Sequence, residues 1–89
     1  MSGIFEGVSD VAGRFSVTLF AGLEERTRER RASREYDPRE APTVGAVIES
    51  LGLAAGAVGL VLVNGVHAGL DRPLGPGDEV ALFPPLGGG

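Results

Sequence analysis

Residues 77–89 read GDEVALFPPLGGG, and three features of this segment constrain the structure. Residues 79–83 alternate between two faces, which predicts a half-buried β-strand. Proline fixes φ and has no amide hydrogen, so Pro84 and Pro85 must end that strand. Glycine has no Cβ, so residues 87–89 can pass through a narrow channel. This geometry suits delivery of a terminal carboxylate into the active site of another protein.

A second informative segment lies upstream. Residues 58–63 are continuously apolar and rich in β-branched side chains, which predicts a central strand buried on both faces. Asn64-Gly65 is a strong hairpin signal, so residues 66–68 are predicted to return as a short strand. The glycine, proline and aspartate of residues 75–78 predict a further turn before the last strand.

The N-terminal half predicts two more strands. Residues 14–21 alternate apolar and polar side chains, as a half-buried strand does. An edge strand near residues 33–37 is predicted to pair with it. The charged residues 23–40 include a short solvated helix or a mobile loop. Residues 1–13 have no sustained period and are predicted to be a flexible N-terminal extension.

One helix is predicted, over residues 43–52. Thr43 supplies an N-cap, and Gly52 supplies a stop in left-handed geometry. Its apolar residues recur at i, i+3, i+4 and i+7, which puts them on one face: Val44, Val47, Ile48 and Leu51.

These elements describe an α+β fold. Its expected form is a roll with a mixed sheet of four to five strands and one main helix packed on one sheet face. At 89 residues the chain has room for one core. The expected domain spans residues 14–86 and is followed by a functional glycine-rich tail at 87–89.

The composition excludes several kinds of chemistry. The sequence has no cysteine, so disulfides, thiolate metal sites and a cysteine nucleophile are excluded. All eight basic residues are arginine, which excludes Schiff-base chemistry and a P-loop lysine. The only histidine, His67, falls in the predicted hairpin and is expected to be a surface residue. Asp78 and Glu79 are expected to belong to a solvated turn, where Asp78 can bond its own backbone.

The charge distribution bears on partners. Residues 24–40 contain six acids and six arginines, so this window has no net positive charge for phosphates, and we expect no nucleic-acid partner. The whole chain carries a formal charge of −4, which favours a protein partner with a basic surface. The nearly apolar stretch 51–63 is too short to span a membrane. No targeting segment is visible, and we expect a cytoplasmic protein with no membrane association.

The VLVNG segment at residues 61–65 and the segment at 77–89 together resemble the MoaD/ThiS family of sulfur carriers. The resemblance covers about residues 14–89 and implies a ubiquitin-like β-grasp fold. Phe83-Pro84-Pro85 is more similar to the molybdopterin-synthase small subunit than to the thiamine branch. Two features depart from the pattern: Gly87 stands where a small residue such as serine commonly precedes Gly-Gly, and segments 1–13 and 23–35 are longer than the family requires.

The resemblance also implies a function. In that family an E1-like enzyme uses ATP and Mg to adenylate the terminal carboxylate, and sulfur then replaces AMP to give a thiocarboxylate. The reacting group here is the carboxylate of Gly89. The protein is then a carrier and not an enzyme, with no bound cofactor or metal. The residues expected to guide the tail into partners are Phe83, Pro84, Pro85, Leu86, Gly87 and Gly88.

The expected partners are the activating enzyme, which docks on exposed apolar residues of the sheet, and the large subunit of molybdopterin synthase, which supplies the catalytic groups. Three alternatives stay open. The carrier can serve thiamine, cysteine or tRNA thiolation; the chain can be a ubiquitin-like protein modifier; or it can be a binding module with an inert tail.

Overall fold

The structure, a computed structural model, describes residues 13–86. The predicted extension lies outside the described residues except for Gly13. The elements in chain order are β1 (Phe15–Leu19), the 3-10 helix η1 (Leu23–Arg26), β2 (Ser33–Tyr36), α2 (Val44–Ser50), the 3-10 helix η2 (Ala55–Ala57), β3 (Leu60–Val63), β4 (Val66–His67) and β5 (Glu79–Phe83).

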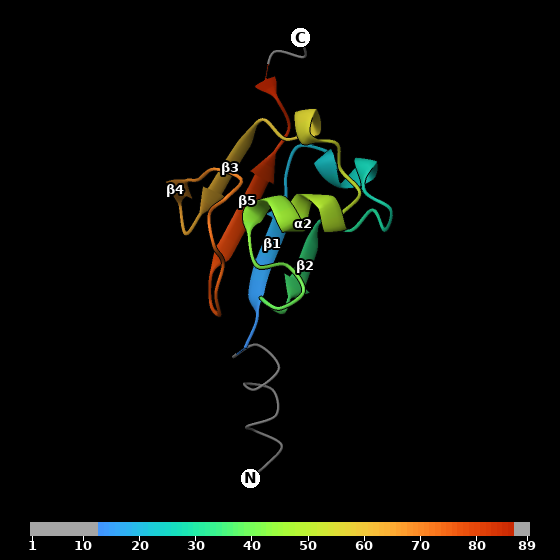
Figure 1. The fold of residues 1–89 in the computed structure, drawn as a ribbon. Coiled ribbons are helices and arrows are strands. Elements are labelled where there is room, and N and C mark those ends of the chain that lie inside the picture. The colour runs from blue at the N-terminus through green and yellow to red at the C-terminus, as the bar shows by residue number, and fades with distance from the viewer. Residues whose placement is uncertain (1–12, 87–89) are drawn as a thin grey trace.

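The five strands form one mixed sheet in the order β2-β1-β5-β3-β4. The central pair, β1 and β5, is parallel, and every other neighbouring pair is antiparallel. Helix α2 packs across one face of this sheet (Figure 1). The predicted α+β roll, with a mixed sheet and one main helix, is confirmed.

The core lies between α2 and this sheet face. Alternate residues of each long strand point into it, and the helix contributes the apolar stripe predicted from its spacing. The buried residues of these elements are Phe15, Val17, Leu19, Tyr36, Val44, Val47, Ile48, Val61, Val63, Val80 and Leu82.

Both ends of α2 are formed as predicted. The side-chain oxygen of Thr43 accepts a hydrogen bond from the backbone N–H of Ala46 at 3.2 Å. Gly52 has φ +79°, and the N–H of Leu53 bonds back to the carbonyl of Ile48 at 3.2 Å. A left-handed residue with this back bond ends a helix in a Schellman motif.

The prediction for residues 58–63 is wrong in one respect. Strand β3 begins at Leu60, and only Val61 and Val63 are buried. Leu60 and Leu62 point to the other face of the sheet and are half-buried. Since the one α-helix among the described residues covers only the inner face, the outer face stays open. The exposed apolar residues expected on the sheet lie on this open face, although the sequence did not identify Leu60 and Leu62 among them.

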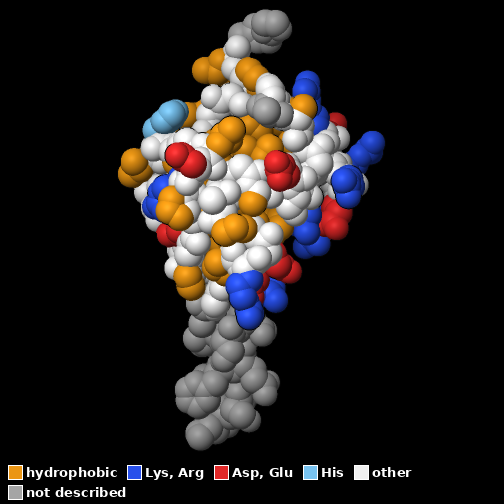
Figure 2. Space-filling view, in the orientation of Figure 1, with side chains coloured by type: hydrophobic (Ala, Val, Ile, Leu, Met, Phe, Trp, Pro, Cys, Tyr) orange, Lys and Arg blue, Asp and Glu red, His pale blue; other side chains and the backbone are white. Residues whose placement is uncertain are grey.

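The charged segment is more firmly held than predicted. It forms the 3-10 helix η1, whose first residue, Leu23, is buried. The hydroxyl of Thr27 donates to the carbonyl of Glu24 at 2.6 Å and accepts the N–H of Arg30 at 3.0 Å. The predicted edge strand is confirmed as β2. Charged side chains gather along the flank that carries η1 and β2 (Figure 2).

Candidate functional site

The C-terminal end of β5 places the last described residues at one end of the sheet. Pro84 and Pro85 end the strand after Phe83, as predicted. The N–H of Gly59 donates to the carbonyl of Phe83 at 2.8 Å. Leu86 is 93% exposed, so the chain is in solvent one residue after the prolines.

Gly59 lets the two prolines lie against the chain just before β3. A Cβ on Gly59 would lie 2.5 Å from the Cα of Pro85 and 2.8 Å from its nitrogen, closer than real Cβ contacts. The absence of a side chain here therefore allows the backbone of Pro84 and Pro85 to lie this close, and the bond from Gly59 to Phe83 holds the two segments together. Together with Leu60, Phe83 and Leu86 these residues line a shallow apolar hollow.

The structure thus brings together four of the predicted site residues at this end of the sheet: Phe83, Pro84, Pro85 and Leu86. Gly87, Gly88 and Gly89 lie outside the described residues, and their predicted roles stay predictions.

Two aromatic rings flank the place where the chain leaves the sheet. The rings of Phe20 and Phe83 are stacked, with centroids 4.7 Å apart and planes inclined by 9°. They meet because β1 and β5 are parallel and Leu19 pairs with Leu82, which puts the next residue of each strand on the open face. Phe20 is 41% exposed.

The rings continue into an apolar patch on the open face. Leu60 pairs with Phe83, and Leu62 pairs with Ala81, so all four side chains point outward on the same face. We define the apolar patch as Phe20, Leu60, Leu62, Ala81 and Phe83. Polar residues of β1 and β5 border it, namely Ser16, Thr18 and Glu79. An apolar area rimmed by polar groups is typical of a surface that binds another protein.

The Asn-Gly turn and the Gly-Asp turn are joined by a pair of side chains. The side-chain amide of Asn64 donates to Asp78 Oδ1 at 2.9 Å, and the amide oxygen of Asn64 accepts the N–H of Glu79 at 2.9 Å. Asp78 Oδ2 also accepts the N–H of Gly75 at 2.9 Å. The Asn64 amide and then the Gly75 N–H lower the pKa of Asp78, because both stabilise the carboxylate.

Asp78 is therefore an ionised residue that holds two turns together. The carboxylate of Asp78 was predicted to bond its own backbone as in an Asx turn, but it bonds the N–H of Gly75, three residues earlier in the same turn. The link to Asn64 is an addition. Asn64 has φ +55° and Gly65 has φ +81°, as a two-residue hairpin turn requires. These motif residues hold the beginning of β5, at the end of the strand opposite Phe83.

The described residues offer little for catalysis. His67 is exposed on β4, as predicted. Between residues 13 and 86 no group of three histidines or carboxylates is placed to hold a metal ion. Across that same range, none of the helices is both long enough and apolar enough to cross a membrane.

Comparison with models of known protein families identifies the family of this chain. A sequence model described as the ThiS family matches residues 17–89. The chain belongs to the ThiS family. The MoaD/ThiS resemblance is confirmed, and this ThiS-family chain falls among the ubiquitin-like sulfur carriers and modifiers, small proteins that are generally non-catalytic. A search of curated protein sequences finds no match.

Solved structures similar to this ThiS-family protein confirm the β-grasp fold. SAMP1 from Haloferax volcanii is 30% identical with a TM-score of 0.63, and the match covers 86% of this chain and 100% of that one. The putative molybdopterin converting factor subunit 1 from Pyrococcus furiosus is 24% identical with a TM-score of 0.64, covering 82% and 98%. Urm1 from Trypanosoma brucei is 22% identical with a TM-score of 0.62, covering 86% and 96%.

Sequence reasoning missed Phe20, Leu60 and Leu62 as surface residues of this ThiS-family protein. The sequence did contain a sign of Phe20. In the alternating strand Phe20 falls on the same outward face as Ser16 and Thr18, yet it is aromatic. The continuous apolar run of β3 carried a signal too, since a strand covered by one helix must expose every second residue.

Proposed function

We propose that this protein is a sulfur carrier whose C-terminal glycine, Gly89, is adenylated and then converted to a thiocarboxylate. The observation that carries the proposal is the exit of the chain at Leu86, beside the apolar patch. The described residues offer an apolar surface and a chain end that leaves the sheet beside it. Such a molecule is a substrate presented to other enzymes.

The chemistry follows from the carboxylate. A carboxylate is a poor acyl donor, so an E1-like partner must activate it with ATP and Mg. An oxygen of the Gly89 carboxylate attacks the α-phosphate, and pyrophosphate leaves. A hydrosulfide sulfur then attacks the acyl carbon and forms a C–S bond. The C–O bond to the phosphate breaks, AMP leaves with that oxygen and the bonding electrons, and a thiocarboxylate remains once the sulfur has lost its proton. We expect the carrier itself to bind no metal or cofactor.

The chain's own residues position this reacting group. Pro84 and Pro85 restrict the backbone, so the tail starts in one direction. Phe83 and Leu86 offer apolar contacts to the walls of a partner's channel. Gly87 and Gly88, being without Cβ, add no width to the segment that must enter it.

The apolar patch supports docking of the activating enzyme. Its stacked pair, Phe20 and Phe83, stands next to the chain exit, so a protein bound there receives the tail at short range. Aromatic residues dominate the energetics of such contacts.

For the acceptor we propose the large subunit of molybdopterin synthase, on the likeness of Phe83-Pro84-Pro85 to the small-subunit branch. Sulfur delivery to thiamine, cysteine or tRNA thiolation uses the same tail chemistry. Reconstitution distinguishes them: the thiocarboxylated protein is mixed with each acceptor enzyme, and the acceptor that consumes the thiocarboxylate identifies the pathway. We expect these reactions in the cytoplasm.

A second candidate, a protein modifier, is favoured by one observation. The 30% identical SAMP1 from Haloferax volcanii belongs to proteins that are named small archaeal modifiers. A modifier joins the Gly89 carbonyl to a lysine of a target. Since this sequence contains no lysine, chains on its own side chains are excluded. Conjugates of larger mass in cell lysate, linked through Gly89, would establish this role.

Intact-mass measurement tests the carrier proposal. The protein is incubated with an E1-like enzyme from the same organism, ATP, Mg and hydrosulfide. We expect a gain equal to the replacement of one oxygen atom by one sulfur atom. A variant that lacks both Gly88 and Gly89, and so no longer ends in Gly-Gly, must show no gain while unfolding at the same temperature. A gain that survives this deletion, or no gain with any activating enzyme of the organism, contradicts the proposal.

A further inference from the structure

Strand β2 forms a free edge of the sheet. Leu19 donates its N–H to the carbonyl of Ala32 at 2.7 Å, and the register places Val17 opposite Arg34. Bonded pairs alternate with non-bonded pairs in an antiparallel ladder, so the backbone groups of Ser33 and Glu35 face away from β1. Within residues 13–86 these outward N–H and C=O groups have no backbone partner.

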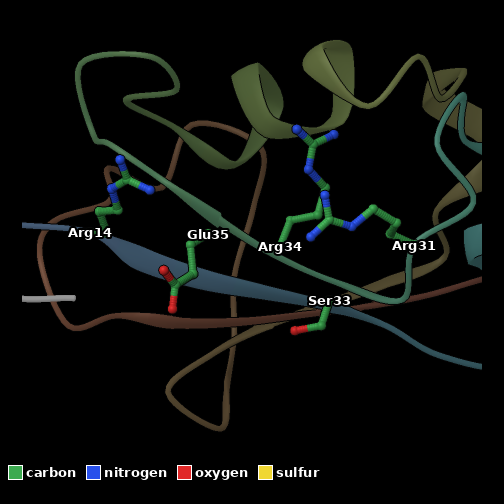
Figure 3. Close-up of a pocket in the computed structure, with 5 residues that line it drawn as sticks. All are labelled: Arg14, Arg31, Ser33, Arg34 and Glu35. Carbon is green, nitrogen blue, oxygen red and sulfur yellow. The ribbon is translucent and has the colours of Figure 1, made fainter. Parts of the chain in front are cut away.

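Arginine side chains surround this edge. Arg14, Arg31, Ser33, Arg34 and Glu35 line a hollow along β2 (Figure 3). The three arginines outnumber the two nearby carboxylates, Glu35 and Glu29, in a chain that is acidic as a whole. Figure 3 shows Arg14 and Arg34 extending toward the helix side of the sheet, whereas Ser33 and Glu35 point to the opposite side.

Two of these arginines, Arg31 and Arg34, already have one carboxylate neighbour. Glu29 lies 3.3 Å from Arg34 and 3.8 Å from Arg31, and the Glu29 side chain is half exposed. The Arg31 pair is exposed, so it contributes little and is readily exchanged. The Arg34 side chain is only 25% exposed, and its pair with Glu29 is the firmer of the two. The guanidinium of Arg34 lies 5.0 Å above the ring of Tyr36, which orients it along the edge.

We propose that the free edge of β2 binds an extended acidic segment of a partner protein, which adds to the sheet as a sixth strand. The segment bonds to the outward backbone groups of Ser33 and Glu35. Side chains of an added strand alternate between the two faces, so its acidic residues occupy the helix side, next to Arg14 and Arg34. On the side of the sheet away from the helix, the carboxylate of Glu35 repels acidic side chains. We therefore expect every second residue of the segment to be uncharged.

This surface is separate from the one used in the proposed function. β1 lies between β2 and β5, and β5 carries the chain exit. A partner on the β2 edge therefore leaves the apolar patch free, and both surfaces can be occupied at once.

A synthetic peptide tests the proposal. The probe is a capped hexapeptide of alternating aspartate and valine, titrated into the full ¹⁵N-labelled chain. We expect amide shifts centred on β2, and slower hydrogen exchange at the N–H groups of Ser33 and Glu35 in the saturated complex. The same peptide with asparagine in place of aspartate must bind more weakly.

Two kinds of variant test the contribution of the arginine charges and that of the backbone hydrogen bonds separately. Arg14→Gln and Arg31→Gln each weaken binding about two- to fivefold. Arg26→Gln, which removes a charge outside the hollow, leaves binding unchanged. Ser33→Pro removes one outward N–H without breaking a bond to β1, which an edge strand tolerates, and it abolishes binding.

Any one of the following peptide results overturns the proposal: shifts that map away from β2, unchanged exchange at Ser33 and Glu35 in the complex, equal affinity for the asparagine peptide, or normal binding by a folded Ser33→Pro variant. Inorganic phosphate is titrated separately. If phosphate produces the same shifts and displaces the peptide at comparable concentration, the edge is a small-anion site and the proposed strand addition is wrong.

Discussion

Replacing Gly59 with alanine probes the position of the tail without touching the tail. The new Cβ would lie 2.5 Å from the Cα of Pro85, whereas carbon atoms in contact stay about 3.5 Å apart. Pro84 and Pro85 must therefore move by about 1 Å, which is the difference between these two distances. Gly59 has no positive φ, so the contact and not the backbone conformation is responsible.

We expect this change to lower both the stability of the protein and the rate of its adenylation. The displacement strains the 2.8 Å hydrogen bond from Gly59 to Phe83, and crowding of this kind costs about 1–3 kcal/mol of unfolding free energy. A tail start that is misplaced by about 1 Å lowers kcat/KM for adenylation about tenfold or more. Urea unfolding gives the first quantity, and pyrophosphate release by the activating enzyme gives the second.

Gly75→Ala is the matched control, because a Cβ on Gly75 has no atom within 4 Å and its φ is not positive. We expect this variant to be as stable and as active as the wild type. If Gly59→Ala behaves like Gly75→Ala in both assays, then Gly59 does not hold the prolines in place, and the reasoning about the chain exit is refuted.

Three further changes test other parts of the account. Phe20→Ala removes the stacked ring and lowers the unfolding free energy by about 1 kcal/mol; a pull-down with the activating enzyme must lose binding, and retained binding would exclude the apolar patch as its docking surface. Asn64→Ala removes a bond that lowers the pKa of Asp78. That bond contributes about 1 kcal/mol above the unfolded-state pKa of about 4. The difference from wild type must shrink as the pH falls through the lower folded-state pKa in acid unfolding curves, and a difference that grows toward low pH contradicts it. Gly52→Ala places a Cβ at φ +79° and costs about 1–2 kcal/mol in thermal unfolding; an unchanged melting temperature argues against the helix stop.

Local signals were enough to predict β1, α2 and the end of β5. Alternation predicted β1, the i, i+3, i+4, i+7 spacing predicted α2, and Thr43 and Gly52 bound the helix because capping depends only on neighbouring backbone groups. The two prolines likewise ended β5 where expected, since a residue without an amide hydrogen cannot extend a ladder.

Contacts between distant segments could not be predicted in the same way. The link between Asn64 and Asp78 depends on β3 and β5 lying side by side, which neither turn encodes by itself. The two-sided burial predicted for β3 failed because an apolar run does not show how many sheet faces are covered. Phe20 entered the apolar patch only because β1 and β5 pair in parallel.

The arginine-rich segment shows the same limit. The net charge of residues 24–40 is indeed zero. A net charge summed along the sequence does not show which of these side chains the fold brings together and which it separates. Arg14, Arg31 and Arg34 meet along the β2 edge because the chain turns between β1 and β2. The local excess of positive charge there exists only in the folded chain.

The central claim is that this molecule acts through the carboxylate of Gly89. The most direct test compares the protein with a semisynthetic copy in which that carboxylate is a carboxamide, a change that leaves every described residue in place. The measurement is ATP–pyrophosphate exchange catalysed by the activating enzyme. The account predicts exchange with the carboxylate form and none with the amide; equal exchange with both forms would contradict it.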